Sequence, residues 1–374
     1  MKKIIYLDNA STTKVYPEVA KVMEKVMLNQ YGNPSSSHDL GDEARKIIND
    51  SRIILAKEIN AKAYEVIFTS GATESNNLAL FGVAGSKLGK IKKNIIISSI
   101  EHSSIYESVK ELEKQGFEVI EVPVDNNGLI DIDYLKNKID NNTLIVSIIH
   151  GNNELGVLQN IEEIGSICNK HGVLFHTDCS QSFGKDKIDV RKMNISLLSA
   201  SGHKIGASKG IGLLYIKEGI ELEQRLFGGS QEMNRRAGTE NVAGIAGFSK
   251  AIEITRKHDV KKVRIVRDYF ISQLENIGGK INGSKEKRLS NIVSVTFDCD
   301  AENLMIFLSG KGIMCSTRSA CDEKSKKESR VLESIGLKEK EIKGTLRFSL
   351  GFDTNKKDID YVIREIKKFI KMNS

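Results

Sequence analysis

Short β-branched and aliphatic runs alternate with longer amphipathic runs from about residue 40 to residue 255. The run 144–149 is apolar throughout, as expected of a strand buried on both faces. Alternation of this kind predicts a mostly parallel sheet covered by helices, in an α/β fold. The pattern predicts seven strands, at 66–69, 94–98, 119–122, 144–149, 173–177, 195–199 and 211–216, and helices that include 75–86, 105–114 and 161–171.

The pattern changes after residue 255, where a long charged amphipathic helix is expected over 256–277. A chain of 374 residues is too long for one small core and suits a large domain plus a smaller one. The last part therefore predicts a smaller α/β domain. Its expected elements are strands at 292–297 and 346–350 and helices at 302–310, 328–335 and 358–372.

Composition narrows the classes of protein that this chain can belong to. With 40% hydrophobic and 28% charged residues, it is typical of soluble globular proteins rather than disordered ones. The net charge of +7 comes from interleaved basic and acidic residues without an aromatic-rich basic module, so no direct nucleic-acid role is expected. No stretch approaches a membrane span, and the apolar run 4–7 is too short for a signal peptide.

The five cysteines are odd in number and irregularly spaced, which favours a reduced cytoplasmic protein over a disulfide scaffold. Cys315 and Cys321 are separated by five residues. A lone pair is a weak metal signal because a zinc site usually needs four ligands, so no metal is expected.

Lys204 and Asp178 are the residues that point most directly to a chemistry. Lys204 closes the run 199–204 just after the apolar stretch 195–198, and Asp178 ends the apolar stretch that begins at residue 173. A lysine amine that forms imines and a carboxylate that holds a protonated ring nitrogen are the groups that a pyridoxal 5'-phosphate (PLP) enzyme needs most. If both lie at the ends of neighbouring strands, the chain is predicted to be a PLP enzyme.

Other polar clusters also follow predicted strands, where ligands of open α/β sheets bind. The run 69–74 contains small residues before a helix, which suits an anion, although Thr73 or Ser75 could simply cap that helix. His102 could stack on a flat ring or move protons, or be structural. The cluster 150–156 could serve a turn or a ligand.

Asp178 and Gln181 follow the next strand, where the aspartate could alternatively cap a helix. The glycine-rich basic loop 228–241 is a second candidate phosphate contact, or an ordinary surface loop. Because five successive strand ends carry polar groups, a shared site explains them better than coincidence.

Two residues of the smaller part are also candidates. Cys321 precedes the polar run 323–329, whose composition predicts a mobile, exposed loop suited to a nucleophilic thiol or an incidental one. Arg347 lies among apolar residues of a predicted strand. Such an arginine holds a carboxylate or phosphate, or forms an internal salt bridge.

Taken together, these motifs resemble the cysteine desulfurases of the NifS/IscS type, in the class V aminotransferase group of fold-type I PLP enzymes. The resemblance covers nearly the whole chain. The motifs that carry it are 6–13, 32–36, 69–77, 101–102, 152–156, 178–184, 201–204, 236–242, 319–321 and 347–351.

The resemblance implies PLP as the cofactor, L-cysteine as the substrate and a homodimer. It implies a large domain over 15–255 and a small domain made of 1–14 and 256–374, which carries Arg347 and the Cys321 loop. Lys204 would form the imine with PLP, and Cys321 would take sulfur as a persulfide while alanine is released. The sulfur would pass to acceptors such as an iron–sulfur scaffold or a thiolation protein.

The remaining site residues are likewise implied by the resemblance. His102 would stack on the ring, Asp178 would pair with its nitrogen, and Gln181 would bind its oxygen. Asn153 and Arg347 would grip the substrate carboxylate. The phosphate site would comprise Ala72, Thr73, Ser201, His203 and, from the other subunit, Thr239.

One position departs from the family pattern, because Arg318 stands where the loop usually has glycine. Its charge should favour a thiolate at Cys321. The hypothesis is that Arg318 tunes Cys321 or the docking of its acceptor. Another PLP enzyme of this fold, an aminotransferase or a selenocysteine lyase, is the alternative, and the two are separated by the effect of Cys321→Ser on sulfide release.

Overall fold

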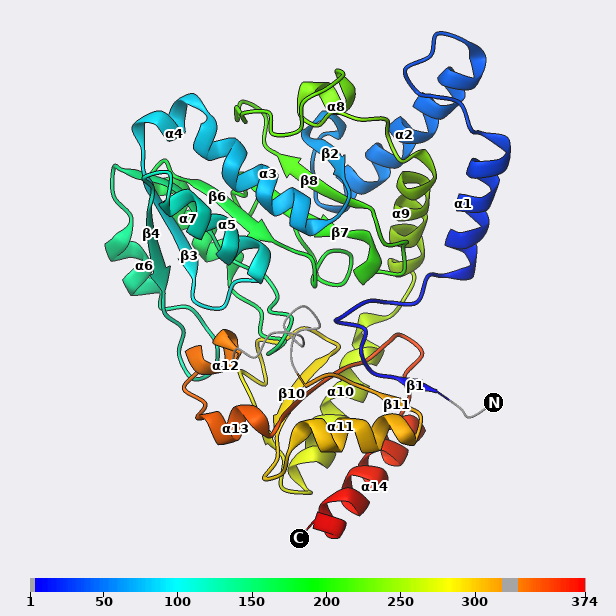
Figure 1. The fold of residues 1–374 in the computed structure, drawn as a ribbon, viewed down its shortest axis with the longest axis vertical. Helices are drawn as coiled ribbons and strands as arrows, with labels where there is room; N and C mark the ends of the chain where they lie inside the picture. The colour runs from blue at the N-terminus through cyan, green and yellow to red at the C-terminus, as the bar shows by residue number, and fades with distance from the viewer. Residues whose placement is uncertain (1–3, 318–328, 374) are drawn as a thin grey trace.

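The structure, a computed structural model, describes residues 4–317 and 329–373. Cys321 and Arg318 lie outside these described residues. Its main feature is a seven-stranded sheet in the order β2-β8-β7-β6-β5-β3-β4 (Figure 1). The strands are β2 (Val66–Thr69), β3 (Asn94–Ser98), β4 (Glu118–Val122), β5 (Thr143–Ser147), β6 (Leu174–Asp178), β7 (Leu197–Ser201) and β8 (Gly212–Ile216).

All neighbouring strands of this sheet run parallel except at β8, which is antiparallel to both β2 and β7. The predicted mostly parallel α/β sheet is therefore confirmed. Consecutive side chains explain why the strands are apolar throughout: Ile95 and Ile97 of β3 pack into one core, and Ile96 packs into another on the opposite face. A strand buried on both faces cannot alternate apolar with polar residues.

Helices cover both faces of this sheet (Figure 1). Apolar residues of α3 and α5 join the core that contains Ile95, while those of α2, α7 and α9 join the core that contains Ile96. The helices in this part are α1 (Pro17–Asn29), α2 (Asp39–Glu58), α3 (Ala72–Gly85), α4 (Lys87–Ile91), α5 (Ser103–Glu113), α6 (Ile132–Lys138), α7 (Ile161–Lys170), α8 (Gln231–Asn234) and α9 (Val242–Thr255).

A smaller antiparallel sheet, in the order β12-β10-β9, has a hydrophobic core of its own. The N-terminal β1 (Ile5–Tyr6) pairs with β11, and Ile5 and Leu7 lie in this second core. The assignment of residues 1–14 to a small domain agrees with this packing but stays a prediction. The elements are α10 (Val260–Glu275), β9 (Lys280–Ile281), β10 (Ile292–Thr296), α11 (Ala301–Gly310), β11 (Ile313–Met314), α12 (Arg330–Ser334), α13 (Glu339–Lys343), β12 (Thr345–Ser349) and α14 (Lys356–Asn373).

Element boundaries differ from the sequence expectation at several places. The helix expected from residue 75 begins at Ala72, because Gly71 rather than a hydroxyl side chain occupies its N-cap. The helix expected over 256–277 is α10, and α9 precedes it. The two-residue strand β9 was not predicted, because two residues are too few to show the alternation of a strand. Its pairing with β10 is not marked by any local pattern. Across the described residues, no helix combines the length and apolar character that crossing a bilayer requires.

Candidate active site

The carboxyl ends of β6 and β7 place Asp178 and Lys204 at one edge of the large sheet. Asp178 is the last residue of β6, and Lys204 ends the short 3-10 helix η2 (Gly202–Lys204) that follows β7. The two strands are parallel neighbours, with Asp178 beside Ser199. The condition stated from the sequence, that both residues follow neighbouring strands, is therefore met.

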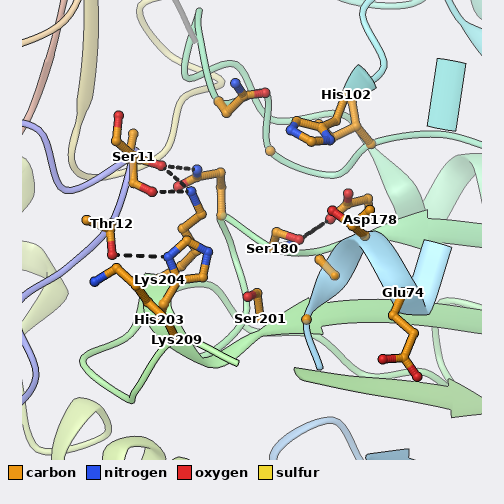
Figure 2. A pocket seen from close by; sticks show the side chains of 18 of the residues that line it. Ser11, Thr12, Glu74, His102, Asp178, Ser180, Ser201, His203, Lys204 and Lys209 are labelled. Atoms are coloured by element: carbon orange, nitrogen blue, oxygen red, sulfur yellow. Dashed lines mark hydrogen bonds between the residues drawn. The ribbon is translucent and has the colours of Figure 1, made fainter. Parts of the chain in front are cut away.

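Both side chains line a cavity of about 570 Å³ (Figure 2). Its walls include every predicted cofactor-binding or substrate-binding residue except Thr239. They are Ala72, Thr73, His102, Asn153, Asp178, Gln181, Ser201, His203, Lys204 and Arg347. The structure thus brings together residues that lie almost 280 positions apart in the chain, from Ala72 to Arg347.

The amine of Lys204 reaches across the cavity to the N-terminal segment. Its Nζ donates to the carbonyl oxygens of Ala10 at 2.6 Å and Ser11 at 2.8 Å (Figure 2). These carbonyls hold the amine inside the cavity by hydrogen bonds that another acceptor could replace.

Donors surround the buried carboxylate of Asp178. Its Oδ1 accepts from the backbone N–H of Ser180 at 2.8 Å and from the Ser180 hydroxyl, and its Oδ2 accepts from Asn76 Nδ2 at 2.8 Å. The turn of residues 179–184 follows in place of a helix, so the alternative that Asp178 caps a helix is wrong. The aspartate instead organises a turn through Ser180.

His102 stands at the N-cap of α5, where it lines the same cavity. Its Nδ1 accepts from the backbone N–H of Ser104 at 3.1 Å and lies 2.8 Å from the Ser104 hydroxyl. The histidine is therefore both a helix cap and a cavity residue, and its ring orientation is set by Ser104.

The N-terminus of α3 forms another wall. Gly71, Ala72 and Thr73 line the cavity, and the N-cap Gly71 makes no side-chain cap hydrogen bond. The alternative that Thr73 or Ser75 caps this helix is therefore wrong. Backbone N–H groups at an uncapped helix start favour an anion.

His203 and Ser201 also line the cavity. His203 Nδ1 lies 3.1 Å from Thr12 Oγ1. Burial, and then the charges of Lys204 and Lys209, lower the pKa of His203 to about 4. A neutral histidine at physiological pH can donate one hydrogen bond without adding charge.

Arg347 is buried on β12 and bonded on two sides. Its Nη2 donates to Asp8 Oδ1 at 2.9 Å and Ser11 Oγ at 2.6 Å, and its Nη1 donates to the Asn153 carbonyl at 3.1 Å. Its Nε is buried and has no hydrogen-bond partner among the described residues. The two alternatives for this arginine coexist: it forms an internal salt bridge, and it also lines the cavity.

The cluster at 150–156 forms a turn, and its role in binding a ligand stays a prediction. Asn152 Oδ1 accepts from the backbone N–H groups of Glu154 and Leu155, which makes a turn. Asn153 lines the cavity. In the same cluster, Nδ1 of His150 is hydrogen-bonded to the Ser182 hydroxyl, and burial lowers the pKa of His150 to about 4.

The glycine-rich basic loop does not reach the cavity with Thr239, which is exposed. Arg236 of this loop pairs with Glu74, a cavity residue, at 2.8 Å. The expected contribution of Thr239 from a second subunit stays a prediction. Cys321 lies outside the described residues, so its place relative to the cavity also stays a prediction.

Several residues around the cavity were not singled out from the sequence. The N-terminal segment contributes Ala10, Ser11 and Thr12, and Ser180 and Asn76 hold Asp178. The sequence could have identified Asn76, because it is a polar residue among the mostly apolar residues that form the buried side of α3, such as Leu78 and Leu80. Nothing in the local pattern marks the N-terminal carbonyls, because any residue type can supply them.

Comparison with known proteins shows the family. Residues 5–362 match the family described as aminotransferase class-V. This chain belongs to the class V aminotransferase family. Members of this family use PLP.

Full-length relatives carry a common name. A protein of Dictyoglomus turgidum named cysteine desulfurase IscS is 40% identical, over 99% of this chain and 95% of its own length. One of Methanosarcina thermophila with the same name is 42% identical, over 98% of this chain and 92% of its own length.

Solved structures agree with this grouping. A structure titled NifS-like protein has a TM-score of 0.93 at 34% identity and covers 99% of this chain and 100% of its own. Another, titled SspA in complex with cysteine, has a TM-score of 0.85 at 36% identity, with 94% of this chain and 99% of its own covered.

The cavity fits the cofactor of this family. PLP requires an amine for its aldehyde, a carboxylate for its ring nitrogen and donors for its phosphate. Lys204, Asp178 and the uncapped start of α3 supply these groups in one cavity. Gln181 adds an amide whose Oε1 is buried without a hydrogen-bond partner among the described residues, while its Nε2 donates to the Ala10 carbonyl.

Proposed function

We propose that this protein is a PLP-dependent cysteine desulfurase, which releases L-alanine from L-cysteine and leaves the sulfur as a persulfide on Cys321. The observation that carries the proposal is the placement of Lys204, Asp178 and Arg347 in one cavity. The names of the full-length relatives support the same activity.

Lys204 has two tasks in this reaction. Its amine would hold the cofactor through the aldehyde, and the same amine would move the proton at the substrate α-carbon. When bound, PLP supplies an electron sink for the charge left at that carbon. The carbonyls of Ala10 and Ser11 accept from the lysine amine and keep it inside the cavity.

The other cavity residues orient the cofactor. Asp178 would pair with the ring nitrogen, His102 would lie against the ring face, and Gln181 would bind the ring oxygen. The phosphate would meet the start of α3, which carries Ala72 and Thr73, with Ser201 and His203 as further donors. His203 would bind the phosphate as a hydrogen-bond donor.

Arg347 and Asn153 would bind the substrate carboxylate. A guanidinium binds a carboxylate through two parallel hydrogen bonds, which fixes orientation as well as affinity. Arg347 is already held by Asp8, Ser11 and the Asn153 carbonyl, which use both N–H bonds of Nη2 and one of Nη1 and leave the second N–H of Nη1 for the substrate. The arginine is thus held in position before the substrate arrives.

Cys321 would take the sulfur. Its thiolate attacks the substrate sulfur, so that the new S–S bond forms as the C–S bond of the substrate breaks. Transfer to an iron–sulfur scaffold or a thiolation protein in the cytoplasm would follow. Cys315 is a poor substitute, because burial first, and then Asp8, raise the pKa of its thiol to about 12.

The protein is also proposed to be a homodimer. Leu226, Phe227 and Met233 are exposed apolar side chains in the segment that also contains the exposed Thr239. Exposed large apolar residues on one segment favour a protein interface. A second copy covering this segment would bring Thr239 to the phosphate site of its partner.

The test uses the purified protein and two variants. The wild type is expected to be yellow and to lose its colour on borohydride reduction, whereas Lys204→Ala gives no reducible adduct. After anaerobic incubation with L-cysteine, peptide mass mapping should find one extra sulfur on the peptide that contains Cys321. In the presence of an added thiol reductant, Cys321→Ser should keep the colour and release no sulfide; sulfide release at the wild-type rate would exclude the persulfide route.

A further inference from the structure

Asn76 is fully buried in the first turns of α3, and it is not itself among the residues that line the cavity. Its side-chain amide nitrogen is nevertheless connected to two cavity residues: it is hydrogen-bonded directly to Asp178, and through Ser104 to His102. Nδ2 donates to Asp178 Oδ2 at 2.8 Å and to Ser104 Oγ at 2.9 Å. One amide group therefore uses both of its N–H bonds.

The direction of each hydrogen bond follows from the chemistry of the groups. A carboxylate only accepts, so the atom of Asn76 that faces Asp178 is the amide nitrogen. The backbone N–H of Ser104 only donates, so His102 Nδ1 is an acceptor. The Ser104 hydroxyl accepts from Asn76 and donates to that same Nδ1, 2.8 Å away.

The tautomer of His102 follows from this chain of bonds. With Nδ1 accepting, the proton of the neutral imidazole is on Nε2. Asp178 is held at the other end, because Asn76 binds one carboxylate oxygen and Ser180 binds the other. Rotation of the carboxylate would break at least one of these bonds.

We propose that Asn76 is a positioning residue that couples the carboxylate of Asp178 to the hydrogen bonding at His102 Nδ1 through the Ser104 hydroxyl. The inference rests on the proposed function, in which Asp178 pairs with the ring nitrogen of PLP and His102 lies against the ring face. A single buried amide would then set the ring-nitrogen partner and the ring-face residue together. No other described side chain is hydrogen-bonded both to Asp178 and to Ser104.

Loss of the amide should weaken cofactor binding. Asn76→Ala leaves Asp178 Oδ2 and the Ser104 hydroxyl without their donor, and a hydrogen bond to a charged group is worth about a factor of ten in an equilibrium constant. The Kd for PLP, measured from the visible band after dialysis of the holoprotein against graded PLP, should rise about tenfold. The matched control is Asn77→Ala, whose neighbouring amide donates to the Thr73 carbonyl; it should change the Kd less than twofold.

A second measurement separates positioning from general destabilisation. In holoprotein labelled with 15N-histidine, the ring nitrogens of His102, identified by their loss in His102→Gln, should show a single Nε2–H tautomer. Ser104→Ala removes the hydroxyl but keeps the backbone N–H that donates to Nδ1, so it should shift the Nδ1 resonance of His102 without moving the proton from Nε2, while changing the Kd for PLP less than threefold. Asn76→Ala should disturb both. If Asn76→Ala does not fold, Asn76→Ser keeps one donor and should shift both measurements in the same direction by less.

The outcomes are distinguishable. A wild type that binds no PLP would overturn the proposed function and this inference with it. A wild type that binds PLP but releases no sulfur would overturn only the desulfurase activity. If Asn76→Ala, or Asn76→Ser in its place, leaves either the Kd within twofold of wild type or the His102 spectrum unchanged, the coupling does not exist.

Discussion

Arg347 shows how one side chain can satisfy two demands. Its side chain is 3% exposed, and a buried cation is costly unless it is paired. Asp8 provides that pairing at 2.9 Å, and Ser11 and the Asn153 carbonyl take further N–H groups. The partners fix the guanidinium in a wall of the cavity, where a substrate carboxylate can meet it.

Replacing Arg347 by lysine tests this account. Arg347→Lys keeps the charge but loses the planar fork, so it cannot bind the carboxylate through two bonds. We expect kcat/KM for L-cysteine to fall about a hundredfold, mainly through KM, with the yellow colour retained. Steady-state alanine release measures the change. A fall in kcat with unchanged KM would contradict a role in carboxylate binding.

At the scale of elements, the buried carboxyl group of Glu101 connects the carboxyl ends of β3 and β5. Glu101 follows β3, and its Oε1 accepts from the Ser98 hydroxyl at 2.5 Å and from the backbone N–H of Ile149 at 2.7 Å. Its Oε2 is buried without a partner among the described residues. Burial raises the pKa of Glu101 to about 8, so this carboxyl holds its proton at neutral pH.

The raised pKa of Glu101 gives a signed prediction for stability. The folded protein retains a proton that the unfolded chain loses near pH 4.3, so the contribution of Glu101 to stability falls as pH rises from about 4.3 to about 8. Glu101→Gln removes this dependence. We expect the variant to gain about 3.5 kcal/mol relative to wild type between pH 5 and pH 8, measured by urea unfolding at both values.

The matched control is Glu121→Gln, on β4, where a half-exposed carboxylate pairs only loosely with Arg330 at 3.8 Å. It should leave the pH dependence of unfolding unchanged. An equal gain in both variants would mean that net charge, rather than the buried acid, causes the effect.

Six strands of the large sheet, all except the edge strand β4, were predicted well because they are buried on both faces, which gives a strong continuous apolar signal. The observed strand ends differ from the predicted ones by one or two residues. In β7 this is because hydrogen bonding to β8, rather than the apolar run, determines where the strand ends. The start of α3 was misplaced because a glycine N-cap carries no side-chain signal. Asn76 was given no role because its partners, Asp178 and Ser104, are on other elements.

In the whole molecule, the N-terminal segment connects the two parts of the chain. It runs from β1, which pairs with β11 beside the smaller sheet, past the cavity to α1 against the larger part (Figure 1). On the way Asp8 binds Arg347, Ala10 and Ser11 bind Lys204, and Thr13 binds the His203 carbonyl. The segment therefore contacts residues supplied by both parts.

The proposed dimer is tested at the same scale. Phe227 is 81% exposed, so a charge there should not disturb the fold but should disfavour an apolar interface. We expect Phe227→Glu to shift the mass measured by light scattering from twice 41.5 kDa toward 41.5 kDa, and to weaken PLP binding because Thr239 of the second copy is withdrawn.

The control for this experiment is Ile91→Glu on α4, which is 76% exposed and lies outside the segment 226–239. It should keep the mass and the PLP affinity of the wild type. A wild type that is monomeric at micromolar concentration would refute the dimer outright.

Patterns in the sequence were enough to predict the α/β class and the seven strands of the large sheet in their order along the chain, and to place Lys204 and Asp178 after strand ends. Those features depend on local patterns of apolar and polar residues, which can be recognised in the amino-acid sequence. The tertiary structure alone decided which ends are neighbours, that Asp8 neutralises Arg347, and that backbone carbonyls at 10 and 11 receive the lysine amine. Contacts of this kind join residues up to about 340 positions apart, and no local period encodes them because they depend on how the sheets and segments are brought together.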